Sequence, residues 1–276
     1  MPKVLTTQQV EQFSEAGFLS PIDVMSEDEA RKYLDRLEAA ERRYPAELNA
    51  ENRNNPHLAF SFLDELVHHP VIVDAMEDLL GPNLSLWGSV LFIKEPQSKG
   101  FVSWHQDSTY MGIEPQEFVT PWLALTTSDR QTGCMSMIPG THKNPVRAHD
   151  DTFQEDNILT RGQAIPDVDE SAAIDLVLRP GQMSIHHARI IHGSRPNRGA
   201  QRRVGYALQS YMAPDARQLV GDNYWLDIRG DNPRENSVSL GRPAFDMDPA
   251  GVANRQRVND NWANILYRGA ERVRAY

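Results

Sequence analysis

A histidine and an aspartate two positions apart, His105 and Asp107, lie in the segment Trp104–Asp107. If this segment is extended, alternate side chains share one face, so both residues can bind the same metal ion. The pattern alone is weak, because His149–Asp151 repeats the same His-x-Asp spacing. We favour His105 because its neighbours are aromatic and apolar, whereas His149 lies in a charged stretch typical of a hydrated surface. The sequence therefore predicts a His–Asp pair on a rigid element.

The segment Pro180–Ser194 carries three more histidines and can supply a third ligand. Two histidines and one carboxylate form a facial triad, whose open positions are typical of non-haem Fe(II) oxygenases. Those positions need an oxidisable co-substrate, and a chelating 2-oxo acid also requires a bidentate cation for its far carboxylate. Arg203 follows His192 by 11 residues, and a hairpin would fold it back beside His192. His187 and Arg198 have the same spacing, but Arg198 lies in the turn itself, so we favour His192.

Together these motifs resemble those of the phytanoyl-CoA dioxygenase family of Fe(II)- and 2-oxoglutarate-dependent oxygenases. The resemblance covers roughly residues 8–215. It rests on Trp104–Asp107, Gly133–His142, Pro180–His187, and His192-Gly193-Ser194 followed by Arg203. It implies that His105, Asp107 and His192 are the iron ligands, with 2-oxoglutarate and dioxygen as co-substrates.

The same resemblance implies which residues hold the co-substrate. Arg203 would bind the distal carboxylate of 2-oxoglutarate, and Ser194 would help to hold it. Trp122 and Gln106 would lie close to the co-substrate, although strand alternation turns Gln106 away from its two neighbours. Only one of Arg202 and Arg203 can face the interior, and we assign Arg203. Lys94 is a weak candidate for the C1 carboxylate and is otherwise interpreted as a surface lysine at a strand end.

The surrounding sequence predicts helices first and short strands afterwards. Helical patterns cover Thr6–Phe18, Met25–Arg43 and Phe62–Leu80, and Ser26 with Glu29 forms a capping box in the second. From Asn83 to Tyr211, short apolar segments are separated by Gly, Pro and Asn. This texture predicts a mainly β sandwich or barrel with flanking α-helices. The fold of the family is a double-stranded β-helix, or jelly roll, which agrees with that expectation.

We expect one domain over residues 1–276. It would consist of a helical part (1–82), a jelly-roll core (about 83–215) and a C-terminal extension (216–276) that ends in a helix. The polar, acidic stretch from His142 to Glu170 has no clear period. A loop of about thirty residues in a compact domain is usually a functional lid or disordered.

Composition limits the partners that this chain can have. Cys134 is the only cysteine, so any metal must be bound by His, Asp or Glu. The net charge of −10 repels nucleic acid and anionic membranes, which favours a small-molecule substrate. No apolar run is long enough to span a bilayer. The start, MPKVLTTQQVEQF, lacks the features of a secretory or transit signal, which predicts a cytoplasmic protein.

The reaction that the resemblance implies is hydroxylation of an unactivated C–H bond, coupled to conversion of 2-oxoglutarate to succinate and CO2. Related halogenating enzymes lack the carboxylate ligand, so Asp107 argues against halogenation. Because the chain is acidic, we expect a small polar metabolite rather than an acyl-CoA. The candidate substrate residues are Asn55, His57, Tyr110, Arg161 and Arg189. His186 and His187 are expected to orient ligands or to pack in the core.

Two alternatives remain at this point. A cupin-like metal enzyme that does not use 2-oxoglutarate would not need Arg203. A non-catalytic jelly-roll binding protein would have no use for the ligand residues, which disuse tends to erode, yet all three and Arg203 are intact here.

Overall fold

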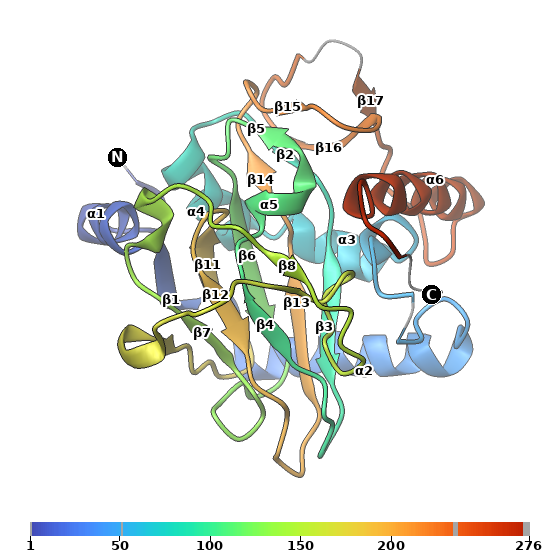
Figure 1. Ribbon diagram of the computed structural model, residues 1–276. Helices are drawn as coiled ribbons and strands as arrows, with labels where there is room; N and C mark the ends of the chain where they lie inside the picture. Colours follow the sequence, from blue (N-terminus) through green and yellow to red (C-terminus); the bar gives the residue numbers. More distant parts are fainter. Residues whose placement is uncertain (1, 51, 234–236, 273–276) are drawn as a thin grey trace.

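The computed structural model describes residues 2–50, 52–233 and 237–272 (Figure 1). The α-helices are α1 (Thr7–Ala16), α2 (Glu27–Arg43), α3 (Ser61–Val67), α4 (Pro70–Leu80), α5 (Ser108–Met111) and α6 (Pro249–Leu266). Three short 3-10 helices are η1 (Pro56–Leu58), η2 (Thr141–Lys143) and η3 (Glu170–Ala172). In the described parts of the chain, no helix combines the length and the apolar character needed to cross a membrane.

The strands are mostly short, as the sequence predicts. They are β1 (Phe18–Asp23), β2 (Leu84–Leu86), β3 (Val90–Lys94), β4 (Val102–His105), β5 (Ile113–Glu114), β6 (Val119–Ala124), β7 (Met135–Met137), β8 (Asp150–Asp151), β9 (Gln163–Ala164), β10 (Ile174–Asp175), β11 (Gln182–His187), β12 (His192–Ser194), β13 (Arg203–Ala207), β14 (Tyr211–Met212), β15 (Arg217–Gln218), β16 (Asn223–Arg229) and β17 (Ser237–Ser239).

Two mainly antiparallel sheets form the core of the fold. The large sheet has the order β1-β11-β6-β14-β2-β16-β17, and β13 lies between β6 and β3. The small sheet has the order β10-β7-β12-β4. Residues of both sheets line one cavity, so the sheets face each other across the interior. The predicted jelly roll with flanking helices is confirmed.

Alternation along the strands of the large sheet separates two apolar clusters. In β13, Val204 and Tyr206 point outward into the main core, whereas Arg203 and Ala207 point between the sheets. The main core includes side chains of α2, α3 and α4, which cover the outer face of the large sheet (Figure 1). The helices thus bury the apolar face of this sheet and leave its inner face for the polar groups of a site.

One predicted helix agrees with the structure in its capping, and another is divided in two. The capping box of α2 is present, with the Ser26 N–H donating to Glu29 at 2.9 Å. The predicted helix Phe62–Leu80 is wrong as a single element, because α3 ends at Val67 and α4 begins at Pro70. Proline disfavours a helical conformation in the residue before it and has no N–H to continue a helix.

The sheet also extends beyond the predicted core at both ends. Gly17 adopts a left-handed conformation with φ of 82°, which ends α1 and lets Phe18 begin β1. The strand β1 then pairs with β11, although it lies in the part predicted to be helical. In the C-terminal extension, β16 pairs with β2 before α6 forms the predicted final helix.

The stretch from His142 to Glu170 is an ordered part of the fold. It contains the paired strands β8 and β9, and Asn157 forms a bridge with Phe101 beside β4. Of the two expectations for this stretch, lid or disorder, the structure agrees with an ordered covering segment.

Candidate active site

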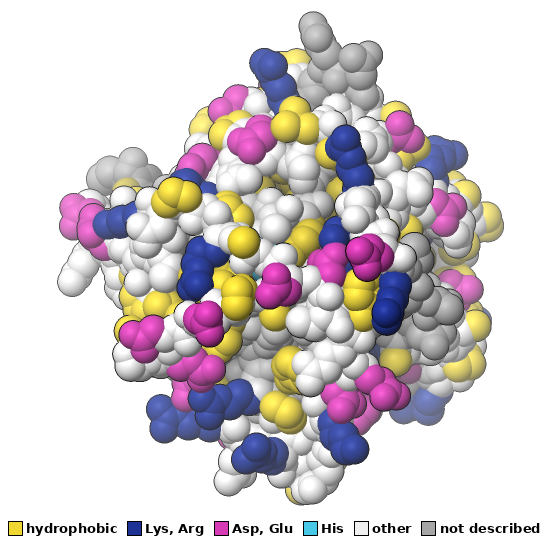
Figure 2. Space-filling view, viewed as in Figure 1, with side chains coloured by type: hydrophobic (Ala, Val, Ile, Leu, Met, Phe, Trp, Pro, Cys, Tyr) yellow, Lys and Arg dark blue, Asp and Glu magenta, His cyan; other side chains and the backbone are white. Residues whose placement is uncertain are grey.

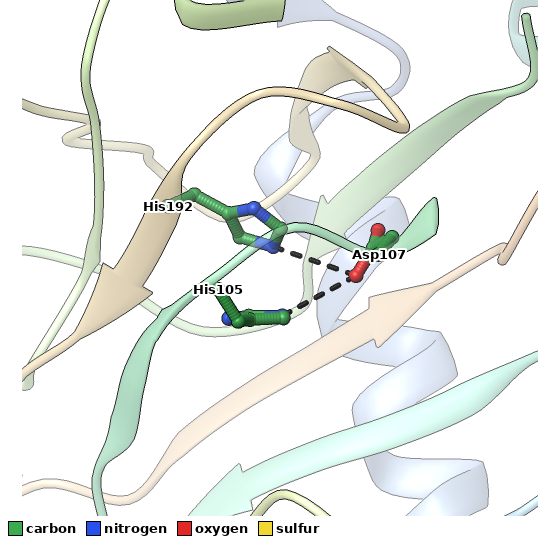
Figure 3. A group of neighbouring side chains, drawn as sticks. All are labelled: His105, Asp107 and His192. Carbon is green, nitrogen blue, oxygen red and sulfur yellow. Dashed lines mark ion pairs between the residues drawn. The ribbon is translucent and has the colours of Figure 1, made fainter. Parts of the chain in front are cut away.

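Three buried side chains converge between the two sheets. His105 ends β4 and His192 begins β12, and the two residues are direct partners in the antiparallel register. Asp107 follows β4 in the turn that opens α5. One possible ligand atom from each residue lies within 4.8 Å of the others (Figure 3). The side chains predicted as iron ligands are therefore brought together, and hardly any histidine surface is visible on the face drawn in Figure 2.

Asp107 reaches this point by a different route from the one predicted. Strand β4 ends at His105, and Asp107 has φ of −57° and ψ of −38°, which is helical rather than extended backbone. The turn places Asp107 Oδ1 3.3 Å from His105 Nε2 and 3.7 Å from His192 Nε2. The argument from strand alternation was therefore wrong, although the two side chains do meet.

Backbone carbonyls fix which ring nitrogen of each histidine is free. His105 Nδ1 lies 2.9 Å from the carbonyl oxygen of Ser103, and His192 Nδ1 lies 3.1 Å from that of Ile190. A carbonyl only accepts, so both Nδ1 atoms carry the proton and both Nε2 atoms present lone pairs. These lone pairs face Asp107 Oδ1, which is also an acceptor. A cation between the three atoms satisfies all of them, so the donor set fits a divalent metal.

Burial and the neighbouring groups keep these ligands in the required protonation states. Burial, together with the imidazole of His105, lowers the pKa of His192 well below its ordinary value, so this imidazole is neutral. Burial alone would raise the pKa of Asp107. The facing imidazoles of His192, His105 and His186 outweigh that effect and hold its pKa well below the ordinary value. At neutral pH, Asp107 is therefore ionised and His192 is neutral.

A cavity of about 50 Å³, which we call the inner pocket, adjoins the triad. Besides the triad, its walls include Thr120, Trp122, His186, Ser194 and Arg203. The ring of Trp122 lies across Gly205, where a Cβ atom would come within 1.7 Å of the ring, so only glycine fits. The guanidinium of Arg203 lies over the same ring at 5.0 Å, a cation–π contact.

Arg203 enters the inner pocket from the sheet opposite His192. Strand β12 pairs with β4 and β7, whereas β13 pairs with β3 and β6. The predicted hairpin is therefore wrong: the connection crosses from one sheet to the other and brings Arg203 toward His192 across the interior. Arg202 points outward and binds Glu41 at 2.6 Å and Glu95 at 2.9 Å. Of the two arginines, Arg203 is the one that faces the interior.

A second buried cation, Lys94, lies beside Arg203 in the register of β3 and β13. The interpretation as a surface lysine was wrong, because Lys94 is 1% exposed. Its Nζ donates to Ser194 Oγ at 2.7 Å and to the Arg195 carbonyl at 2.5 Å. Burial and the nearby Arg203 lower the pKa of Lys94 to about 6, and burial lowers that of Arg203 to about 10. Within the described residues, neither cation has a carboxylate partner.

Gln106, the remaining predicted co-substrate residue, has its side chain bonded to the protein. Its Nε2 donates to the Arg189 carbonyl at 2.6 Å, and its Oε1 accepts from the Arg147 N–H at 2.9 Å. It does not line the inner pocket, so its predicted place beside the co-substrate remains a prediction. His149, expected at a hydrated surface, is half-buried and accepts from the Gln106 N–H at 3.0 Å. Burial lowers the pKa of His149 to about 4.

Comparison with known proteins decides the family. The sequence profile described as Phytanoyl-CoA dioxygenase (PhyH) matches residues 13–205. The chain belongs to the phytanoyl-CoA dioxygenase family. The resemblance inferred from the motifs is thus confirmed over most of the chain.

Two proteins with similar sequences have different described activities. A probable alpha-ketoglutarate-dependent hypophosphite dioxygenase of Stutzerimonas stutzeri is 34% identical over 169 residues, which is 60% of this chain and 58% of that protein. The human peroxisomal phytanoyl-CoA dioxygenase is 27% identical over 201 residues, which is 70% of this chain and 56% of that protein. The matches therefore span less than two thirds of the length of these relatives.

Solved structures match over almost the whole chain. The apo form of ThoJ, described as a non-heme monooxygenase, is 30% identical with a TM-score of 0.83, and the match covers 94% of this chain and 97% of ThoJ. CytC3 with Fe(II) and alpha-ketoglutarate is 22% identical with a TM-score of 0.67, covering 88% of this chain and 95% of CytC3. At 22% identity, the match to CytC3 supports only the fold.

In this family member, a cavity of about 330 Å³, which we call the outer chamber, adjoins His105 and Asp107, and Arg203 is not among its walls. It shares with the inner pocket the residues Phe92, His105, Asp107, Leu159 and Gln209. Its remaining walls are mainly apolar and aromatic, with contributions from β3, the 157–163 segment and the end of α6. Such a volume is typical of a pocket for a small organic molecule.

Of the five predicted substrate residues, the outer chamber includes only Tyr110. Its buried hydroxyl has no partner among the described residues. Arg161 lies over the Tyr110 ring at 5.3 Å but binds Asp151, and Arg189 binds Glu117 at 2.8 Å. Neither arginine lines the chamber, so their positions do not support the prediction that they contact the substrate.

Asn55 and His57, the other two, belong to a buried network beneath α6. Asn55 donates to Asn259 at 2.9 Å and accepts from the Ser89 N–H at 3.1 Å. His57 Nδ1 lies 2.6 Å from Ser89 Oγ, and burial lowers its pKa to about 3. Because Tyr206 donates to the same hydroxyl at 2.9 Å, Ser89 donates its own proton to His57. These residues fasten α6 to the sheet rather than line a cavity.

Sequence reasoning missed three residues of the chamber. Trp87 and Trp262 stack at 4.0 Å and form an aromatic wall, although 175 positions separate them. Arg53 is the one Arg or Lys side chain among the described lining residues, and its buried Nε has no partner in the described structure. No local motif marks these positions; the tryptophan on a predicted C-terminal helix was the only available signal.

Proposed function

We propose that this protein is an Fe(II)- and 2-oxoglutarate-dependent oxygenase that hydroxylates a C–H bond of a small organic molecule, with release of succinate and CO2. One observation carries the proposal. Three ligand atoms with free lone pairs lie beside a pocket lined by the buried guanidinium of Arg203, which has no carboxylate partner among the described residues, and by Ser194, to which the buried Lys94 donates. The triad would bind the metal, and Arg203 would bind a carboxylate of the co-substrate.

The protein's own side chains would position the co-substrate. Arg203 Nη1 donates to the Gly133 carbonyl at 2.5 Å, while its buried Nε has no partner in the described structure. Ser194 accepts from Lys94, so its hydroxyl proton is free to be donated into the pocket. A carboxylate there would receive charge-assisted bonds from the guanidinium and one from Ser194. Bound ferrous iron would supply the activation of dioxygen, which no side chain here can perform.

The outer chamber supports a substrate class that differs from our expectation of a small polar metabolite. Its walls are mainly apolar and aromatic, and Arg53 is the single cation among the described lining residues. A polyphosphate such as CoA would find one cation there, and a hypophosphite ion would leave most of the 330 Å³ unfilled. We therefore favour a medium-sized molecule with an apolar body and a few hydrogen-bonding groups.

Anaerobic titration tests the assignment. Metal-free protein receives Fe(II) and then 2-oxoglutarate, and we expect the weak visible charge-transfer band of the chelate, with no such band in a His105→Ala variant. Succinate release with a panel of small organic molecules then identifies the substrate. Absence of both the band and succinate would refute the oxygenase. Iron binding with no response to 2-oxoglutarate would favour the cupin-like alternative.

A further inference from the structure

A fourth histidine, His186, faces the triad from the opposite sheet. It lies on β11, is 2% exposed, and has Phe18 and Thr120 as its partners in the register. Its ring lies 4.7 Å from that of His192, and it lines the inner pocket. His187, the next residue, turns to the other side, where it contacts Glu117 at 3.0 Å. Strand alternation thus sends one histidine of the pair into the site and the other away from it.

His186 differs from the two ligand histidines in where its proton must lie. Its Nε2 is 3.3 Å from Asp107 Oδ2, and its Nδ1 is buried without a partner among the described residues. A proton on Nδ1 would be buried and unbonded, and the Nε2 lone pair would then face a carboxylate oxygen. Because both features are unfavourable, the proton belongs on Nε2, where it is donated to Asp107.

The two oxygens of Asp107 therefore have different partners. Oδ1 faces the Nε2 atoms of His105 and His192, while Oδ2 faces His186. We propose that His186 is a positioning residue that holds Oδ2 and so restricts Asp107 to binding the metal through Oδ1 alone. This inference rests on the proposed function, because it concerns the metal that the triad would bind.

This restriction has a consequence for the open positions of the metal. A carboxylate can bind a metal through one oxygen or two, and a second oxygen would occupy a position that a chelating 2-oxo acid needs. His186 is not itself part of the metal-ligand group found among the described residues, which contains only the triad. Its contribution is a hydrogen bond to a ligand, and such bonds orient carboxylates in metal sites.

The test compares His186→Phe, which removes the donor, with His186→Gln, which restores an N–H at a similar reach. His187→Phe is the matched control on the other face of the strand. Two measurements are made on each folded variant: the affinity of the Fe(II)-loaded protein for 2-oxoglutarate without oxygen, and the crystal structure with Zn(II) alone. Circular dichroism verifies folding, and His186→Leu replaces the phenylalanine variant if that variant does not fold.

We expect one Asp107 oxygen on Zn(II) in the wild type and both oxygens in His186→Phe. The affinity for 2-oxoglutarate should fall about tenfold in His186→Phe, recover in His186→Gln and stay unchanged in His187→Phe. The proposal is overturned if His186→Phe keeps single-oxygen binding with an affinity within about twofold of wild type. It is also overturned if His186 itself binds Zn(II), or if His187→Phe loses as much affinity. A wild type that gives no charge-transfer band refutes instead the proposed function.

Discussion

The inner pocket and the outer chamber meet at His105 and Asp107, yet they are built by different means. The inner pocket is lined largely by strands of both sheets, and its walls include the buried Arg203 and Ser194, to which the buried Lys94 donates. The outer chamber is larger, and β3, the 157–163 segment and the end of α6 contribute to its largely apolar walls.

The difference indicates which half of the site is fixed and which half can vary. The pairing register of the strands fixes which side chains face the inner pocket. A shift of one residue in this register would point those side chains away from the pocket. Some walls of the outer chamber lie instead on the 157–163 segment, and loop segments tolerate change more readily than strands. We therefore expect the inner pocket to determine the co-substrate and the outer chamber to determine the substrate.

Removal of the guanidinium from the inner pocket should give the largest effect. In Arg203→Ala, a buried carboxylate would lose its bidentate partner, which is worth about 2–3 kcal/mol, or roughly 100-fold in affinity for 2-oxoglutarate. Titration of 2-oxoglutarate into anaerobic Fe(II)-loaded protein measures this loss.

Arg202→Ala is the matched control for this variant. Arg202 pairs with Glu41 and Glu95 at the outer face, so we expect no change in co-substrate affinity. Fe(II) affinity should also stay unchanged in Arg203→Ala. Equal losses of iron and 2-oxoglutarate would contradict the assignment of Arg203 to the carboxylate.

A change in the aromatic wall should affect only the outer chamber. Trp262→Leu removes the ring that stacks on Trp87, and we expect KM for the substrate found by succinate release to rise about tenfold. The dissociation constant of 2-oxoglutarate should stay within about twofold of wild type. Trp262→Phe keeps an aromatic face, so its KM for the substrate should lie between those of the wild type and Trp262→Leu. If the co-substrate weakened as much as the substrate, the two cavities would not be independent.

The sequence alone was sufficient to select candidate residues where the chemistry allows only a few residue types. Few side chains can bind ferrous iron or a buried carboxylate, so His105, Asp107, His192 and Arg203 could be selected by type and spacing. The reasons given for their meeting were less accurate, because a helical turn brings in Asp107 and a crossing between sheets brings in Arg203. Residue type thus carried more information than the assumed local geometry.

The substrate residues could not be selected in this way, because hydrogen bonding and packing groups are common throughout a chain. Asn55 was a plausible pocket residue, but its partner Asn259 lies 204 positions away on α6. Lys94 was interpreted as exposed because it ends a strand, yet the Ser194 hydroxyl and two backbone carbonyls surround its ammonium group. Contacts between such distant segments follow from the fold, which a single sequence does not show.

The smallest expected effect concerns Lys94 and pH. Burial and Arg203 lower the pKa of Lys94 to about 6, so it is mostly neutral at pH 8 and gains a proton as the pH falls toward 6. A carboxylate bound nearby favours the charged form, so the affinity for 2-oxoglutarate should rise a few-fold between pH 8 and pH 6. The neighbouring Arg203 and Cys134 have pKa values of about 10 and 11 and do not titrate in this range.

Lys94→Met tests this dependence, because it removes the titrating group and keeps most of the buried volume. We expect its affinity for 2-oxoglutarate to be the same at pH 6 and pH 8, whereas that of Trp262→Leu should follow the wild-type profile. An unchanged slope in Lys94→Met would assign the pH dependence to another group. Since Lys94 contacts the co-substrate pocket only through Ser194, a Ser194→Ala variant should keep the direction of the slope while lowering the affinity at both pH values.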